Sequence, residues 1–252
     1  MVRLKTSEEI AAIGKSGRIL ALVLKKITKA AKPGANLSSL DKLAAEIMAS
    51  RGAESAFFRY CPAGAPRPYP AHICASLNDV IVHGIPDAYK LRKGDLLKID
   101  IGVRYKNFIS DAAVTLAIGP ISRSVRRLIR GTKEALTVGV KAAKIGNHLG
   151  DIGYAIQKIA QKNRLSIIDG LAGHGVGFAP HEDPLVHNFG RPGSGPALKE
   201  GMVIAIEPMF SLGSPKTVEL RDGSFATLDR SLSAHFEHTV AITKRGPQIL
   251  TL

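Results

Sequence analysis

The stretch GDLLKIDIG, residues 94–102, decides the fold of this chain. It has the apolar character of a buried strand, yet Asp100 stands between two isoleucines. A carboxylate in such a place costs roughly several kcal/mol unless its charge is compensated. A second stretch, GMVIAIE at 201–207, also opens on glycine, runs apolar and reaches an acid, Glu207. This recurrence, about one hundred residues later, indicates two related halves that each place an acid in a sheet.

The segments that precede these strands repeat as well. KPGANLSSLDKLAAEI at 32–47 aligns without a gap to KIGNHLGDIGYAIQKI at 144–159, and each is a glycine-containing turn followed by apolar residues at helical spacing. We therefore predict an α+β fold in a single domain over 1–252, with an internal repeat of roughly 1–121 and 122–252. Each half would have two helices followed by a sheet. Chance similarity between two amphipathic helices is the alternative.

The expected elements follow from periodicity and from capping and turn residues. Ser7 is the expected N-cap of the first helix, and Ser38 or Ser39 that of the second. The stretches 61–70, rich in proline, and 190–196, rich in glycine, are expected to be loops. Helices are predicted near 7–31, 38–51, 122–142 and 149–163, and strands near 72–76, 80–82, 95–104, 108–118, 166–173, 202–210, 217–220 and 234–243.

Composition limits the class of protein. The chain has 252 residues, of which 45% are apolar and 22% charged, so it can bury a sizeable core. No apolar run approaches the roughly 18 residues that span a bilayer, and the N-terminus lacks the hydrophobic segment of a secretory signal. Its two cysteines cannot form a disulfide framework. We therefore predict a cytoplasmic protein that does not enter a membrane, and nothing in the sequence demands more than a monomer.

The net charge of +14 predicts attraction to polyanions, including ribosomal RNA near emerging chains. An ordinary solvated surface is the alternative, because the basic residues are scattered except for one cluster at Arg123, Arg126, Arg127 and Arg130.

Three further residues join Asp100 and Glu207 as candidates for one site. Asp111, in YKNFISDAAVTL, would lie on the strand next to Asp100, and alternation can place both on the same face. Glu237, in SAHFEHTVAI, is again an acid in an apolar setting. His174 is flanked by glycines in GLAGHGVG, which lets the backbone come close to a bound group.

Four converging carboxylates would repel one another, but two divalent cations would balance their charge. Oxygen donors with one imidazole suit Mn, Fe(II) or Co and can also take Zn. Two such ions can hold and deprotonate a water. For each acid alone, the alternative is a buried salt bridge to one of the 35 basic residues.

Two other histidines are candidates for catalysis. His83, in NDVIVHGIP, and His181, in PHEDP, could each donate a hydrogen bond to a carbonyl or a developing oxyanion. A lone histidine is more often structural, and that interpretation is kept for the remaining five: His72, His148, His187, His235 and His238.

These motifs resemble those of the methionine aminopeptidases, in their type I, bacterial-like form. The resemblance covers nearly the whole chain and is carried by NDVIVHGIP, KIDIG with Asp111, GHGVG, HEDP, IEPMF and DRSLSAHFEHT. It implies the pita-bread metallopeptidase fold, with two pseudo-twofold-related halves whose helices pack outside a curved, mainly antiparallel sheet. It also implies an enzyme that removes the initiator methionine of nascent proteins when the second residue is small.

The resemblance implies a role for each candidate residue. Asp100 would bind one metal ion, Asp111 and Glu237 would bridge both ions, and His174 and Glu207 would complete the second. Glu207 would also handle the proton of the attacking, metal-bridging water. His83 and His181 would contact the scissile amide. The methionine pocket would be formed by Tyr69, Cys74 and Phe225, with Phe178 as a further candidate.

Several positions depart from the family pattern, and they leave pocket shape, metal affinity and activity open. The loop 61–70 aligns poorly, and Lys98 and Pro180 stand where the family usually has a small polar and a large apolar residue. The other departures are Val82, Ala112, Ala113 and Phe225.

Two other functions stay open. An Xaa-Pro aminopeptidase or dipeptidase on the same fold usually carries an additional N-terminal domain, for which the 99 residues before Asp100 leave little room. A non-catalytic module that binds RNA or the ribosome would be expected to lose metal ligands, and all five are present. A type II enzyme would show a long insertion between His174 and Glu207, where this chain has a spacing of 33 residues.

Overall fold

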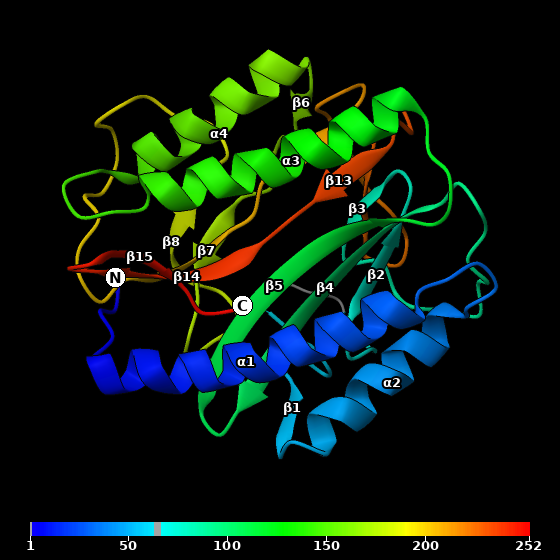
Figure 1. Cartoon of the computed structure of the whole chain (residues 1–252), viewed down its shortest axis with the longest axis horizontal. Helices are drawn as coiled ribbons and strands as arrows, with labels where there is room; N and C mark the ends of the chain where they lie inside the picture. The colour runs from blue at the N-terminus through cyan, green and yellow to red at the C-terminus, as the bar shows by residue number, and fades with distance from the viewer. Residues whose placement is uncertain (1, 63–66) are drawn as a thin grey trace.

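The computed structural model describes residues 2–62 and 67–252. Two helix pairs flank a set of curved strands (Figure 1). The helices α1 (Ser7–Ala30) and α2 (Leu37–Ala49) lie along the bottom of that view, and α3 (Arg123–Ala142) and α4 (Leu149–Asn163) along the top. The buried apolar face of each pair packs mainly on a different set of strands, which gives two main core clusters.

Among residues 2–62 and 67–252 the strands form four sheets, in which every pairing is antiparallel. The first sheet has the order β1-β4-β2 with β5 added on β4, and the largest has the order β15-β14-β9-β7-β8. The two smaller sheets are β13-β10-β6 and β11-β12-β3. The α+β fold class is thereby confirmed, whereas the division into halves near residue 121 stays a prediction. The strands are β1 (Ala53–Ser55), β2 (Cys74–Leu77), β3 (Val80–Val82), β4 (Leu96–Tyr105), β5 (Phe108–Ala117), β6 (Ser166–Ile167), β7 (Gly173–Gly175), β8 (Glu182–Val186), β9 (Val203–Ile206), β10 (Met209–Ser211), β11 (Thr217–Glu219), β12 (Phe225–Thr227), β13 (Ser233–His235), β14 (His238–Thr243) and β15 (Gly246–Ile249).

The helix bounds agree with the prediction within two residues, but two predicted caps are wrong. Thr6, not Ser7, caps α1, because its hydroxyl accepts the Glu9 N–H while the Glu9 carboxylate accepts the Thr6 N–H. This reciprocal pair satisfies two backbone donors at once. Asn36 caps α2 through the Ser38 N–H, so neither predicted serine does.

The register of β4 and β5 places two acids on one face. Asp100 lies opposite Ala113, and Gly102 lies opposite Asp111. Residues paired across an antiparallel ladder share a face, so both carboxylates point away from α1 and α2. The alternate residues of β4 fill the core beneath those helices: Leu97, Ile99, Ile101 and Val103.

Two predicted strands are interrupted at the other two acids. The predicted strand 202–210 is divided into β9 and β10 at Glu207 and Pro208, because proline has no N–H for a ladder. The predicted strand 234–243 is divided into β13 and β14 around Glu237, whose N–H donates to the Ala113 carbonyl of β5 at 2.9 Å. This hydrogen bond joins β5, which carries Asp111, to the segment that carries Glu237.

The remaining differences concern short elements. The predicted strand 166–173 consists of β6 and the start of β7, and the strands β1, β8, β12 and β15 were not predicted. The stretch 190–196 is a loop, as is the described part of 61–70, whereas residues 63–66 lie outside the described residues. Within 2–62 and 67–252, no helix is both long and apolar enough to cross a membrane.

Candidate metal centre and active site

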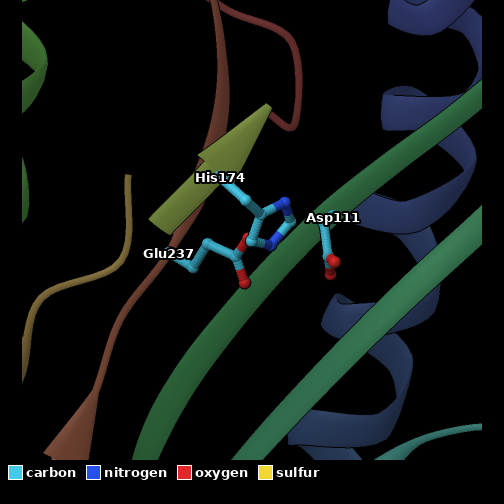
Figure 2. A group of neighbouring side chains, drawn as sticks. All are labelled: Asp111, His174 and Glu237. Atoms are coloured by element: carbon cyan, nitrogen blue, oxygen red, sulfur yellow. The ribbon is translucent and has the colours of Figure 1, made fainter. Parts of the chain in front are cut away.

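Three buried side chains from distant parts of the chain converge on one point. Asp111 comes from β5, His174 from β7, and Glu237 from the junction of β13 and β14, and they point toward one another in Figure 2. One potential ligand atom from each lies within 4.8 Å of the others. Three donors at this separation could coordinate a single cation.

The other two predicted ligands adjoin this group. His174 Nε2 lies 3.4 Å from Glu207 Oε1, and Asp100 and Asp111 lie on the same face of the neighbouring strands β4 and β5. All five line one cavity of about 810 Å³. The structure therefore brings together every residue that was predicted as a metal ligand.

Asp111, Glu207 and Glu237 are buried and Asp100 is half-buried, and no described lysine or arginine compensates their charge. Burial, with the charge of Glu207, raises the pKa of Asp111 to about 7, and burial also raises the pKa of Glu207 to about 7. Burial and neighbouring carboxylates raise the pKa values of Asp100 and Glu237 well above their usual range. Within the described residues, no lysine or arginine pairs with any of the four, so the salt-bridge alternative is wrong.

Unpartnered atoms at this site fit a divalent cation. Three buried carboxyl oxygens lack a hydrogen-bond partner among the described residues: Asp100 Oδ1, Asp111 Oδ1 and Glu237 Oε1. Such orphaned acceptors are unusual in a folded protein. Carboxylate oxygens are suited to a hard or borderline cation. Such a cation would pair with the unpartnered oxygens and would also offset the repulsion between the carboxylates.

The backbone around His174 fixes its ring. Its Nδ1 lies 2.9 Å from the Gly175 carbonyl, which favours a proton on Nδ1 and leaves Nε2 free to act as a ligand. The flanking glycines let β7 lie close to its neighbours, since a Cβ at Gly173 would strike the Ala205 carbonyl and one at Gly175 the Asp183 carbonyl. Burial lowers the pKa of His174, which favours the neutral imidazole that binds metals.

The two predicted catalytic histidines face the same cavity. His83 follows β3 with φ 60, a left-handed conformation that is uncommon for residues other than glycine. His181 follows the loop after β7, with Nδ1 3.2 Å from the Tyr60 hydroxyl and its ring 4.5 Å from that of His174. Desolvation lowers the pKa of both rings, which favours neutral imidazoles that can donate one hydrogen bond.

The predicted pocket residues Tyr69, Cys74 and Phe225 line the cavity, but Phe178 does not. The Tyr69 hydroxyl donates to the Gly84 carbonyl at 3.0 Å, beside His83. Phe178 lies instead under the Arg3 guanidinium, 3.5 Å from its ring centroid.

The prediction missed the position of His235. Its Nε2 lies 3.3 Å from Glu207 Oε2, and burial together with the charge of Lys98 lowers its pKa to about 3. Glu207 thus has a histidine at each carboxylate oxygen. A signal existed, because His235 precedes Glu237 by two residues and the alternation of a strand would place both on one face.

Four of the positions that depart from the family pattern line this site or adjoin its residues: Val82, Lys98, Ala113 and Phe225. Lys98 is fully buried, its Nζ donates to the Asn78 carbonyl at 2.6 Å, and burial lowers its pKa to about 7. Val82 lines the cavity, and the Phe225 ring lies edge-on to His83 with centroids 5.9 Å apart. Ala113 pairs with Asp100 across the ladder.

Comparison with known proteins assigns the chain to a family. The model of metallopeptidase family M24 matches residues 11–244. The chain belongs to this family. Membership implies divalent metal ions, for which the buried cluster offers the donors.

Within M24, the chain is similar over its full length to methionine aminopeptidases. It is 42% identical to that of Clostridium perfringens, over 100% of this chain and 99% of the relative. The structure of the methionine aminopeptidase from Rickettsia prowazekii superposes with a TM-score of 0.95 at 36% identity and covers 100% of both chains. The prolidase from Pyrococcus furiosus superposes with a TM-score of 0.78 at 25% identity, but this chain covers 65% of its length. The predicted resemblance and the pita-bread fold are confirmed.

Proposed function

We propose that this chain is a metal-dependent aminopeptidase that removes N-terminal methionine from peptides whose second residue is small. The observation that carries the proposal is the set of five metal-ligating side chains, unpaired with any described lysine or arginine, that line a cavity of about 810 Å³. Full-length similarity to proteins named methionine aminopeptidase supports the substrate.

Two divalent ions fit the five donors. Asp100 would hold one ion, His174 and Glu207 the other, and Asp111 and Glu237 both. Co, Mn, Fe(II) and Zn all accept carboxylate oxygen with one imidazole. When bound, the ions supply positive charge that stabilises the developing oxyanion and promotes ionisation of a water.

The chain's own groups would perform the proton transfers. The Glu207 carboxylate, with its oxygens against His174 and His235, would accept the proton of the attacking water and return it to the leaving amine. His83 and His181 would each donate an N–H to the scissile amide, so that negative charge on the tetrahedral carbon's oxygen is stabilised. Neutral rings suit this task because each keeps one donor N–H.

The methionine side chain would lie against Tyr69, Cys74 and Phe225. An unbranched thioether packs well beside aromatic rings, and sulfur–aromatic contacts are favourable.

The proposal also includes a binding partner, the ribosome. The four arginines of α3 that were noted in the sequence, Arg123, Arg126, Arg127 and Arg130, are all exposed, which supports docking of this helix on ribosomal RNA. Such docking would weaken steeply with rising salt, and co-sedimentation with ribosomes at increasing salt tests it. A monomer in the cytoplasm is also part of this proposal.

An Xaa-Pro aminopeptidase is the second candidate, because prolidases share the fold. The deciding experiment offers Met-Ala-Ser and Ala-Pro-Ala to the metal-loaded protein. Release of methionine from the first peptide supports the proposal, and cleavage before proline alone would move the assignment to the second candidate. Cleavage of neither peptide by folded, metal-loaded protein would favour a non-catalytic binding module.

A further inference from the structure

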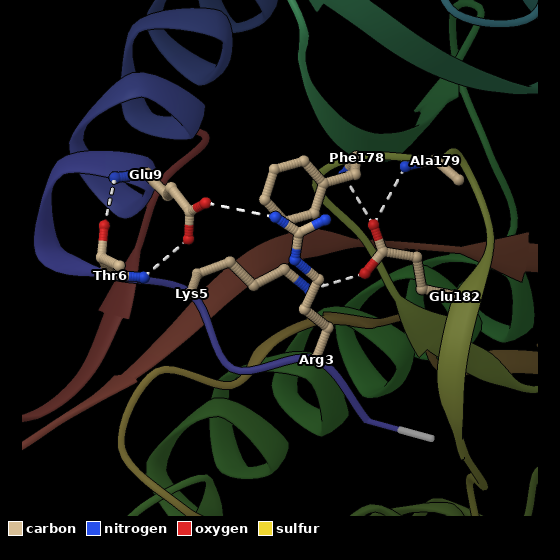
Figure 3. Close-up of polar contacts among 7 residues, drawn as sticks. All are labelled: Arg3, Lys5, Thr6, Glu9, Phe178, Ala179 and Glu182. Atoms are coloured by element: carbon tan, nitrogen blue, oxygen red, sulfur yellow. Dashed lines mark hydrogen bonds and ion pairs between the residues drawn. The ribbon is translucent and has the colours of Figure 1, made fainter.

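The N-terminal arm, residues 2–6 ahead of α1, makes a part-buried ion pair with a distant part of the chain (Figure 3). Lys5 Nζ lies 2.6 Å from Glu182 Oε2, and the two side chains are 1% and 15% exposed. The Lys5 N–H also donates to the Gly201 carbonyl at 2.7 Å. The capping box of Thr6 and Glu9 fixes the adjoining end of α1. The arm is therefore held on both sides of Lys5.

The same glutamate organises the loop that carries His181. Glu182 Oε1 accepts the Phe178 N–H at 2.6 Å and the Ala179 N–H at 2.9 Å, as Figure 3 shows. This segment, residues 176–181, is called the His181 loop here. The Arg3 guanidinium covers the Phe178 ring at 3.5 Å, so the arm contacts the loop at a second point.

The His181 loop joins two residues of the candidate site. It follows β7, which contains His174, and ends at His181, directly before Glu182 at the start of β8. Any shift of the Glu182 backbone therefore moves His181. The His181 ring contacts the Tyr60 hydroxyl and the His174 ring at the cavity. A displacement of about 1 Å in a group that contacts the substrate can lower the reaction rate roughly 100-fold.

We propose that Lys5 and Glu182 are positioning residues, which hold the His181 loop so that the His181 ring faces the substrate. The proposal rests on the function proposed above, in which His181 contacts the scissile amide. It makes the N-terminal arm part of the active-site support rather than a solvent-exposed extension. Removing one partner leaves the other charge unpaired at a buried lysine or a part-buried glutamate, and the loop can relieve that penalty by moving.

The kinetic test uses Lys5→Met, Glu182→Gln and the double variant, all loaded with Mn. Glu182→Gln keeps a side-chain oxygen for the two loop N–H groups, so the protein still folds. We expect kcat and kcat/KM for Met-Ala-Ser to fall together by about 10- to 100-fold in each single variant. The double variant should be no worse than either single variant, since the two residues act as one unit. Lys5→Arg should recover most of the rate.

Matched controls make the same substitutions in an exposed pair. Lys162 Nζ lies 3.0 Å from Glu134 Oε1 on the α3–α4 surface, with side chains 67% and 42% exposed. Lys162→Met and Glu134→Gln should leave the rate unchanged within about twofold, because exposed pairs contribute little.

A second readout needs neither metal nor substrate. The ring signals of labelled histidine in the metal-free protein can be assigned to His181 with a His181→Asn variant. Lys5→Met and Glu182→Gln should shift or broaden the His181 signal and leave that of His148, at the start of α4, unchanged. A wild-type His181 signal with wild-type kcat, even with lower thermal stability, would overturn the proposal. If the wild-type protein fails to release methionine, the proposed function fails, while the His181 signal still decides whether the ion pair positions this ring.

Discussion

Replacing Asp111 by asparagine should stabilise the metal-free protein while it destroys the metal site. Burial and the charge of Glu207 raise the pKa of Asp111 from 3.8 to about 7 in the folded state. Each pKa unit corresponds to about 1.4 kcal/mol, so above pH 7 the ionised carboxylate opposes folding by about 4 kcal/mol. The asparagine amide avoids that penalty but leaves buried polar atoms poorly paired, at a cost of about 2 kcal/mol. We expect a net gain of about 2 kcal/mol at pH 8.

The gain should depend on pH in a defined direction. Because the pKa is raised by folding, the contribution of Asp111 to stability is fully present below pH 3.8 and is lost as the pH rises through about 7. The advantage of Asp111→Asn should therefore be absent near pH 4 and grow toward pH 8. Urea unfolding followed by circular dichroism, in the presence of a chelator, measures the free energy of unfolding at each pH.

Two comparisons make the test specific. Adding Mn at about 100 times its Kd should stabilise the wild-type protein by about 2.7 kcal/mol, and the variant far less. Asp229→Asn is a control for which the opposite change in stability is expected. The backbone N–H groups of Ser214 and Ser231 lower the pKa of Asp229, so the folded state favours its carboxylate and the variant should lose stability. An Asp111→Asn protein that is no more stable than wild type at pH 8 without metal would refute the reasoning.

Three further predictions concern the site and its support. Asp100→Ala or Glu207→Ala should abolish hydrolysis of a Met-Gly peptide while circular dichroism shows an intact fold, and near wild-type turnover with metal supplied would contradict the assigned ligands. Gly175→Ala should lower the free energy of unfolding by about 2 kcal/mol or more and reduce activity, since its Cβ would strike the Asp183 carbonyl; a normal melting temperature would show that β7 and β8 can separate. Thr6→Ala should lower the free energy of unfolding by about 1 kcal/mol, whereas Ser7→Ala should have little effect, because Thr6 is the N-cap. Equal losses of stability for the two variants in urea unfolding would argue against the capping box.

The sequence predicted the site because its anomaly is local. An acid within an apolar strand is visible without any knowledge of the fold, and the second one at Glu207 indicates that the first is not accidental. Period-two alternation then places Asp100 and Asp111 on one face, and the observed register agrees. The interruption after Glu207 could also have been predicted, because Pro208 cannot take part in a ladder.

The features that were missed depend on contacts between distant segments. His235 looks structural until the fold places it against Glu207, and the Lys5–Glu182 pair joins residues 177 positions apart. The strands β1, β8, β12 and β15 have at most five residues, too few for a periodic pattern to identify. The cap at Thr6 was missed because Ser7 has the same type of side chain one residue later.

Methionine release by metal-stripped protein, measured as divalent metal is added stepwise, tests the central claim most directly. The claim is that the five buried donors hold divalent ions on which peptide hydrolysis depends. We expect no release from Met-Ala-Ser without metal, a rise with each addition, and a plateau once the chain is saturated with no more than two ions. Release that is unchanged by complete removal of metal, or no release by folded protein with any of Co, Mn, Fe(II) or Zn, would contradict the account.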